Sequence, residues 1–212
     1  MKFMKKLMMA AGLLLLGMGT GFAQNAVGTV TLQPKVGVNI ATLTDEDDSE
    51  ARVGFTAGAE LGYQVTNKFA LTGALMYSQQ GAKADYEGMT GTMKLDYINI
   101  PILANVYVAK GFALKAGIQP AFNVNKKITV GGISMDIEDA YEKGTGQRIK
   151  VKSFDFSIPM GLSYEINGLV FDARYNLGLS KIVSGFEYEG VKLQPDDKNS
   201  VFQLTIGYKF AL

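Results

Sequence analysis

Apolar and polar residues alternate along most of the chain, and the stretch GFTAGAELGYQV (54–65) shows the pattern clearly. From Val53 to Val65 every odd-numbered residue is apolar, whereas the even-numbered residues are glycines, a threonine, a glutamine and one acid, Glu60. A period of two residues is typical of a β-strand with one apolar face. A lone glutamate fits neither a water-exposed face, which would carry more charges, nor an apolar core, where its burial would be costly.

The same alternation recurs and predicts eight strands. We expect them at residues 32–42, 53–65, 69–80, 95–108, 112–125, 154–166, 169–180 and 201–212. Short turns alternate with four long connections, and Asn167-Gly168 is a strong hairpin signal. The long connections are 43–52, 81–94, 126–153 and 181–200. Helical periodicity is absent after the N-terminal segment. The pattern therefore predicts an all-β, antiparallel up-and-down barrel that closes on itself and leaves no free sheet edge.

The N-terminal segment has the features of an export signal. Lys2, Lys5 and Lys6 precede the apolar run LLLLGMG, and small residues occupy Gly21 and Ala23. We expect a signal peptide over residues 1–23 and a barrel domain over residues 24–212. A membrane anchor is the alternative, but the apolar run is shorter than the roughly 20 residues that a spanning helix needs. Removing three lysines takes the net charge from +1 to −2, which argues against a nucleic-acid partner.

The polar faces of the predicted strands hold small residues with four basic and four acidic side chains. A water-exposed exterior usually has a higher density of charge. A narrow lumen needs small residues and charges that neutralise one another, because an unpaired buried charge is costly. We therefore predict a structural charge network in the lumen, with Glu60 within reach of Lys115 or Arg174. Its members are Lys35, Glu60, Lys115, Asp155, Glu165, Asp172, Arg174 and Lys209.

Aromatic residues on the apolar faces come in pairs near the two ends of five strands. The pairs are Phe55 with Tyr63, Phe69 with Tyr77, Phe112 with Phe122, Phe154 with Tyr164, and Phe202 with Phe210. At about 3.3 Å per residue and a tilt near 40°, each pair spans roughly 20–26 Å along the barrel axis. Transmembrane barrels carry aromatic girdles around an apolar band of about this height. We therefore expect the apolar face to meet outer-membrane lipid, with the short turns in the periplasm and the long loops outside the cell.

Five segments also resemble a known family. PKVGVNIATL (34–43), MYSQQGAK (76–83), DYINIPILANVYV (96–108), DARYNLGLSKI (172–182) and VFQLTIGYKF (201–210) resemble the PorT-like outer-membrane β-barrel family of Bacteroidota. The resemblance implies an eight-stranded outer-membrane barrel and implies no reaction. One founding relative is associated with protein secretion, but membership alone does not transfer that role. The ending Tyr208-Lys209-Phe210 is similar to the aromatic signal read by the barrel-assembly machinery, although the chain continues for two residues.

Little in the sequence points to catalysis or to a cofactor. The chain has no histidine, so barrel proteases and acyltransferases of the histidine-dependent kind lose their base. Charge pairing in the lumen explains Asp155, Glu165 and Asp172 more simply than acid–base chemistry does. The acidic run 44–50 lacks the spacing and glycine of an EF-hand, and we interpret it as a solvated loop. We expect no cofactor and no metal.

The leading hypothesis is a non-enzymatic barrel with a plugged lumen that has an envelope-structural or surface-interaction role. A small channel, a secretion-associated component and a soluble lipocalin-like barrel are the alternatives. Two hairpins are expected in the long loops, at 128–137 and 186–194. They could recruit a partner by β-augmentation or simply cap the barrel, and the sequence favours neither. The expected partners are outer-membrane lipid or lipopolysaccharide, the barrel-assembly machinery and an extracellular partner, and we expect a monomer.

Overall fold

The computed structural model describes residues 26–44, 49–86, 89–146, 149–184, 186–188, 191–193 and 196–212. The predicted signal peptide, residues 1–23, lies outside the described residues, as do the four acidic residues 45–48 of the first long connection.

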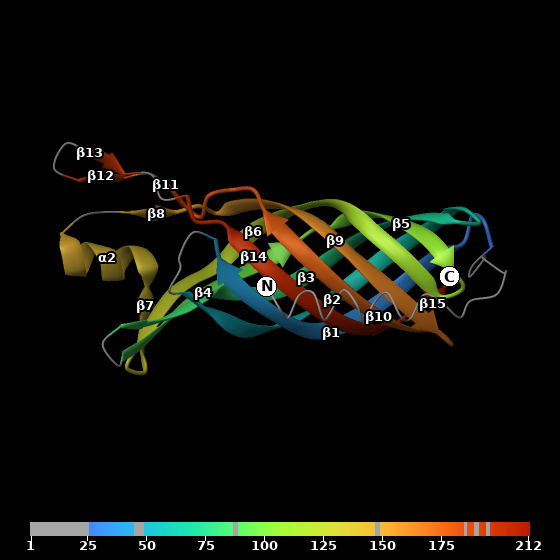
Figure 1. The fold of residues 1–212 in the computed structure, drawn as a ribbon, viewed down its shortest axis with the longest axis horizontal. Coiled ribbons are helices and arrows are strands. Elements are labelled where there is room, and N and C mark those ends of the chain that lie inside the picture. The colour runs from blue at the N-terminus through green and yellow to red at the C-terminus, as the bar shows by residue number, and fades with distance from the viewer. Residues whose placement is uncertain are drawn as a thin grey trace.

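The described strands form a closed antiparallel ring in which each strand pairs with the next along the chain (Figure 1). The ring positions are β1 (Val30–Leu43), β2 (Ser49–Thr66), β3 (Phe69–Tyr86), β4 (Met89–Asn99) with β5 (Ile102–Ala109), β6 (Phe112–Val130), β9 (Phe154–Ile166), β10 (Leu169–Gly178), and β14 (Asn199–Tyr208) with β15 (Phe210–Ala211). β1 pairs with β2 on one side and with β14 on the other, which closes the ring. The predicted eight-stranded up-and-down barrel is confirmed.

Short turns gather at one end of the barrel, which we call the short-turn end; the opposite end is the long-loop end. Asn167 and Gly168 both have positive φ, 51° and 83°, as a type I′ hairpin turn requires. The ring of Tyr208 packs against Gly168, and a Cβ there would lie 2.8 Å from Tyr208 Cζ. Glycine is therefore needed at this turn both for its backbone conformation and for space.

The predicted strand 95–108 is wrong in one respect, because the structure divides it into β4 and β5. Pro101 lies in the break, and a proline has no N–H to give to a strand ladder. Its carbonyl still accepts a hydrogen bond from Ala74 N at 3.0 Å. β3 pairs with β4 and then with β5, so the barrel wall continues across the break.

Four strands continue past their predicted limits at the long-loop end. β2, β3, β4 and β6 extend the wall there, and the β3–β4 hairpin occupies most of the predicted loop 81–94. β6 turns at Gly131-Gly132 into β7 (Ile133–Asp136), so the expected hairpin at 128–137 is present. β12 (Phe186–Tyr188) and β13 (Val191–Leu193) form the second expected hairpin. We refer to the part of the sheet beyond the barrel rim, formed by β3, β4, β6 and β7, as the extension.

A helix, α2 (Ile137–Thr145), follows β7 directly and contradicts the expectation that the long loops contain no helix. The Asp136 side chain accepts a hydrogen bond from Glu138 N, and Gly146 ends the helix with a φ of 71°. Capping by these two residues defines the helix, since nine residues are too few for a clear apolar period. Within the described residues, no helix is long and apolar enough to cross a membrane.

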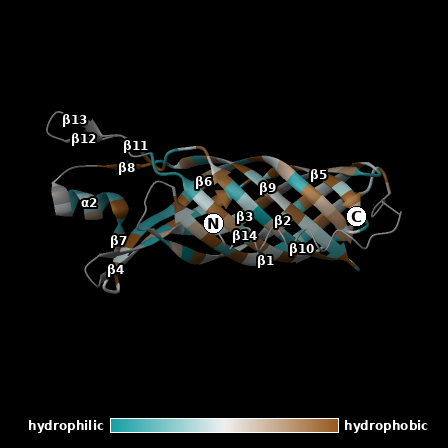
Figure 2. Cartoon of the chain, in the orientation of Figure 1, coloured by the Kyte–Doolittle hydropathy of each residue, from teal (hydrophilic) through white to brown (hydrophobic). Residues whose placement is uncertain are grey.

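The barrel is inside out relative to a water-soluble protein. Apolar side chains are exposed on the exterior of the wall, whereas polar side chains are buried on its inner face. Figure 2 shows hydrophobic and hydrophilic residues alternating along the strands. Leu75, for example, is 59 % exposed, whereas Thr56 and Asn39 on the inner face are fully buried. This arrangement agrees with the predicted face assignment.

The paired aromatic residues lie toward the two ends of the wall. Phe55 contacts Tyr77, and Phe122 contacts Phe154, with ring centroids 5.9 and 5.6 Å apart. Phe112 departs from the prediction, because it is only 8 % exposed rather than open on the outer face. It follows the tight turn at Gly111, where the pairing of β5 with β6 is irregular and Tyr164 lies on the neighbouring strand.

The exposed apolar face predicts a strong dependence on lipid contact. Replacing Leu75, which lies between Phe69 and Tyr77 on β3, with arginine should lower the free energy of unfolding by about 2–4 kcal/mol. Ile133→Arg is the matched control, because Ile133 is 68 % exposed on β7 beyond the wall; its effect should stay within about 0.5 kcal/mol. Urea unfolding in lipid vesicles measures both, and equal effects would contradict the lipid-facing assignment.

Candidate functional site: the charge cluster in the lumen

Glycines next to the long basic side chains make room for them inside the barrel. Lys35 on β1 is flanked in register by Gly58 of β2 and Gly207 of β14. Gly161 of β9 lies between Lys115 of β6 and Arg174 of β10. A Cβ at Gly207 would come within 2.8 Å of Lys35 Cβ, which is too close for two side chains. The small residues of the polar face are therefore what allow large cations to fill the lumen.

Five buried charges meet in the middle of the barrel, and we call them the central cluster: Lys35, Glu60, Lys115, Asp172 and Arg174. Glu60 lies 2.6 Å from Lys35 Nζ, 3.4 Å from Lys115 Nζ and 3.8 Å from Arg174 Nη2. Asp172 lies 2.7 Å from Lys115 Nζ and 3.1 Å from Arg174 Nη2. Each carboxylate thus bridges at least two cations, and Glu60 lies within reach of both Lys115 and Arg174.

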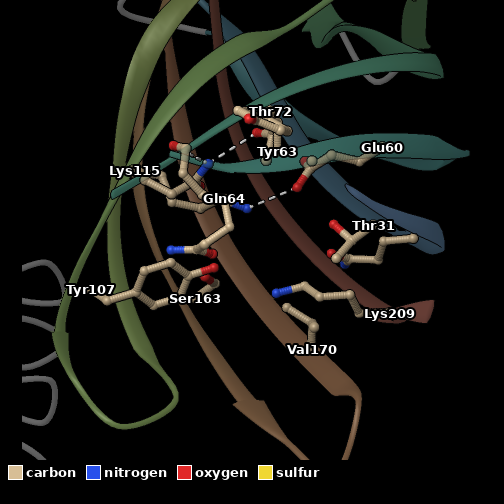
Figure 3. A pocket seen from close by; sticks show the side chains of 14 residues that line it. Thr31, Glu60, Tyr63, Gln64, Thr72, Tyr107, Lys115, Ser163, Val170 and Lys209 are labelled. Atoms are coloured by element: carbon tan, nitrogen blue, oxygen red, sulfur yellow. Dashed lines mark hydrogen bonds and ion pairs between the residues drawn. The ribbon is translucent and has the colours of Figure 1, made fainter. Parts of the chain in front are cut away.

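A small polar cavity adjoins the central cluster on its short-turn side (Figure 3). Its volume is about 20 Å³, and Glu60, Lys115, Gln64, Tyr107 and Lys209 are among the residues that line it. A cavity needs about 10–15 Å³ to hold one water molecule. The space is therefore suited to one or two waters and is far smaller than an organic ligand requires.

The other three predicted lumen charges lie apart from the central cluster. Lys209 forms an ion pair with Glu165 near the short-turn end. Asp155 lies toward the long-loop end, where its Oδ2 accepts a hydrogen bond from Asn199 Nδ2 at 2.8 Å. The structure therefore divides the eight predicted charges into a group of five, a pair and a single acid.

The sequence did not predict a second buried ion pair, between Arg52 and Asp96, at the rim of the barrel. Arg52 Nη1 lies 3.5 Å from Asp96 Oδ1. Asp96 Oδ2 also accepts hydrogen bonds from Tyr77 Oη at 3.0 Å and from Asn125 Nδ2 at 2.8 Å. Arg52 was assigned to a loop, and Asp96 falls on the even-numbered, apolar side of its predicted strand. The register shift at Asp96 and Tyr97 lies on β6, which passes from Asn123 to Asn125, so Asp96 keeps this side of β4. Alternation therefore gave no signal for the pair.

An apolar core lies at the long-loop end. Its buried members come from the barrel wall and from the segments beyond it: Leu43, Ala82, Leu95, Tyr97, Ala121, Ile137, Val151 and Ile182. We call this group the mouth core. α2 is tied to it through Glu138, whose side chain lies 2.6 Å from Lys126 Nζ and accepts a hydrogen bond from Val151 N. The hydrogen bond from Lys126 holds the pKa of the Glu138 carboxyl below its ordinary value, with Val151 N adding to the effect and burial opposing it.

The charged side chains of the central cluster form salt bridges with one another. The carboxylates of the central cluster are occupied by cations, and its lysines by carboxylates. Among the described residues, no group of three or more histidine, cysteine, aspartate or glutamate side chains could hold a metal ion.

Charge balance in the central cluster makes a testable prediction. Glu60→Gln leaves three cations facing one acid and removes the only ion-pair partner found for Lys35 among the described residues. We expect it to lower the free energy of unfolding by about 3–5 kcal/mol. Lys35→Met leaves two cations and two acids and should cost less. The double variant should be more stable than Glu60→Gln alone, and additive losses in a urea-unfolding cycle would show that the two charges do not depend on each other.

Comparisons with known proteins agree with this architecture. Residues 22–184 match the family described as outer membrane protein beta-barrel domain. A search of curated proteins finds no match.

Similar solved structures include Ail, the attachment invasion locus protein of Yersinia pestis, with 16 % identity, a TM-score of 0.48, and coverage of 87 % of this chain and 100 % of that one. Neisserial surface protein A has 14 % identity and a TM-score of 0.48, with 85 % and 97 % covered. OprG of Pseudomonas aeruginosa has 12 % identity and a TM-score of 0.48, with 88 % and 97 % covered. These similarities concern the fold alone. Because the family match spans most of the sequence, the chain belongs to the outer membrane protein β-barrel domain family and is a protein of the outer membrane.

Proposed function

We propose that this protein is a non-enzymatic outer-membrane barrel with a plugged lumen, which acts in the envelope or at the cell surface through its long-loop end. The observation that carries the proposal is the presence of two barriers in series inside one narrow barrel. The central cluster fills the middle of the lumen, and the mouth core packs across its long-loop end.

The geometry of the central cluster supports a closed lumen. Lys35 and Glu60 come from β1 and β2, whereas Lys115 and Arg174 come from β6 and β10 on other parts of the ring. Their ion pairs therefore connect different parts of the wall through the interior. Small eight-stranded barrels have interiors just wide enough for side chains to fill, and the adjoining cavity holds only about 20 Å³. A hydrated ion would have to break several buried salt bridges to pass.

The chemistry of the chain supports a non-enzymatic role. The sequence contains neither histidine nor cysteine, so the usual general base and the usual thiol nucleophile are both missing. The acids that could replace them, Glu60 and Asp172, are already paired with buried cations. These contacts support a structural role for the two carboxylates.

The β6–β7 hairpin supports a surface role. Its apolar side begins at Ile128, which packs against the mouth core, and continues outward through Val130, Ile133 and Met135, which are exposed. Contiguous apolar surface beyond the membrane is typical of contact sites on proteins. β7 pairs with β6 alone in the described sheet, so its other edge is available for an added strand.

The finer assignment to the PorT-like barrels of Bacteroidota belongs to this proposal and rests on the five segments that resemble that family. The placement of the long-loop end outside the cell rests on the usual direction of short periplasmic turns. We further propose a monomer inserted by the barrel-assembly machinery. Nothing in the described contacts favours the channel or the secretion-associated alternative.

Planar-bilayer recording tests the plugged lumen. The purified barrel should show no steady single-channel openings, because the ion pairs of the central cluster and the mouth core both obstruct the path. A water-filled porin recorded in the same bilayer provides the positive control. Steady openings of uniform conductance would overturn the plugged lumen and favour the channel alternative.

Substitutions at the tip of the hairpin test the surface role. Val130→Thr with Ile133→Thr keeps β-branched residues in the strands while removing apolar surface, so the fold should be retained. Cells that display this variant should lose most of the adhesion seen with the original barrel. Thr129→Ser with Ser134→Thr, on the other face of the same hairpin, keeps both hydroxyl groups and serves as the control. Unchanged adhesion of the first variant would contradict a role for this surface.

A further inference from the structure

Two lysines face each other on the outer surface of the extension. Lys94 on β4 pairs in register with Lys127 on β6, and one step further out Thr92 pairs with Thr129. Residues two apart along a strand share a face, so these four side chains lie on one surface. We call them the lysine–threonine patch.

This surface continues the lipid-facing side of the barrel. Ile98 on β4 pairs with Phe122 on the apolar exterior, and Asp96 pairs with Asn125 in the next row toward the long-loop end. The Lys94–Lys127 row comes after that. The bulge on β6 shifts the outward-facing positions from even to odd residue numbers, so Lys127 lies on the same face as Phe122. The patch therefore lies directly beyond the aromatic residues at the long-loop end.

Neither lysine forms a salt bridge within the described part of the protein. No ion pair or hydrogen bond joins the Lys94 or Lys127 side chain to another described residue. Asp136 pairs in register with Lys127 and caps α2 with its carboxylate, and the two side chains form no ion pair. Asp96 is buried and held by Arg52, Tyr77 and Asn125. Like charges directly opposite each other on neighbouring strands are destabilising. An anion between Lys94 and Lys127 would therefore offset the repulsion between their ammonium groups.

Distance along the strand identifies where that anion would lie. Lys94 is four residues beyond Ile98, which corresponds to roughly 10 Å along the axis after allowing for rise and tilt. Headgroups occupy a layer of about 5–8 Å outside the hydrocarbon, and a lysine side chain can reach back toward that layer from above. The aromatic row marks the hydrocarbon boundary. The backbone of the patch therefore lies just above the headgroup layer, and the lysine side chains reach down to the phosphate groups of the adjacent leaflet.

We propose that the lysine–threonine patch binds the phosphate of an anionic lipid headgroup in the leaflet at the long-loop end. The two ammonium groups supply charge, and the two hydroxyls supply hydrogen bonds to phosphate oxygens. The occupant is a membrane lipid rather than free phosphate, because the patch continues an apolar wall that accommodates the acyl chains. This site is independent of the proposed surface role, since it faces lipid on the outer surface of the extension.

The test compares lipids that differ only in phosphate. Native mass spectrometry of the purified barrel in detergent micelles would measure binding of diphosphorylated lipid A and of the same lipid without phosphates. Lys94→Gln with Lys127→Gln should weaken binding of the phosphorylated lipid by about tenfold or more. Lys143→Gln with Lys150→Gln removes the same charge from exposed positions at the same end of the molecule and should bind as the original protein does.

Further arms distinguish the outcomes. Heat-modifiable gel mobility establishes that each variant is folded, and Lys94→Arg with Lys127→Arg should retain binding because it keeps both charges. Equal affinity of the Gln variant and the original protein would overturn the proposal, as would equal binding of the dephosphorylated lipid. Displacement of the lipid by millimolar inorganic phosphate would identify a site for a free anion and would also overturn it.

Discussion

The contact of Glu60 with Lys35, Lys115 and Arg174 is the interaction on which the architecture depends. A barrel that turns its apolar side to lipid must enclose its polar side, and the interior of a small eight-stranded barrel is just wide enough for side chains to fill. Burying a charge is favourable only when the charge is paired and hydrogen-bonded. The opposing charges therefore have to meet, and meeting requires four strands of the ring to hold one register, because a slip of one residue would turn every side chain to the other face.

The two ends of the barrel differ in how the chain returns and in what fills the interior. At the short-turn end, tight turns such as Asn167-Gly168 return the chain at once, and the Glu165–Lys209 pair and a small polar cavity fill the interior. At the long-loop end the strands extend beyond the membrane-spanning wall, and their inner faces become apolar. The extension can then pack Ile137 and Val151 into a conventional core. Its outer face becomes polar and carries Lys94 and Lys127. The same sheet thus has its apolar face outside within the membrane and inside beyond it, because the outer face meets lipid in the first part and water in the second.

Sequence reasoning succeeded wherever alternation was unbroken. Val53 to Val65 has a strict period of two, and the structure places Glu60 inside the barrel as that period requires. It failed where a local feature interrupts the period. Pro101 divides one strand, a bulge shifts the register of β6 opposite Asp96, and Phe112 is covered at a tight turn. α2 is too short for a helical period and is specified by its caps at Asp136 and Gly146.

The sequence by itself determined the fold class, the strand order and the face on which each charge lies, because these follow from period, turn residues and chain connectivity. Only the tertiary structure decided which charges meet. Lys35 reaches Glu60 because the register of β1 and β2 places Gln33 opposite Glu60 and Lys35 two residues further along, and Lys115 reaches Asp172 across the intervening strand β9. It also separated Asp155 from the central cluster and joined Arg52 to Asp96. Pairing depends on stagger, bulges and side-chain reach across the lumen, which are distances in space that a linear pattern does not contain.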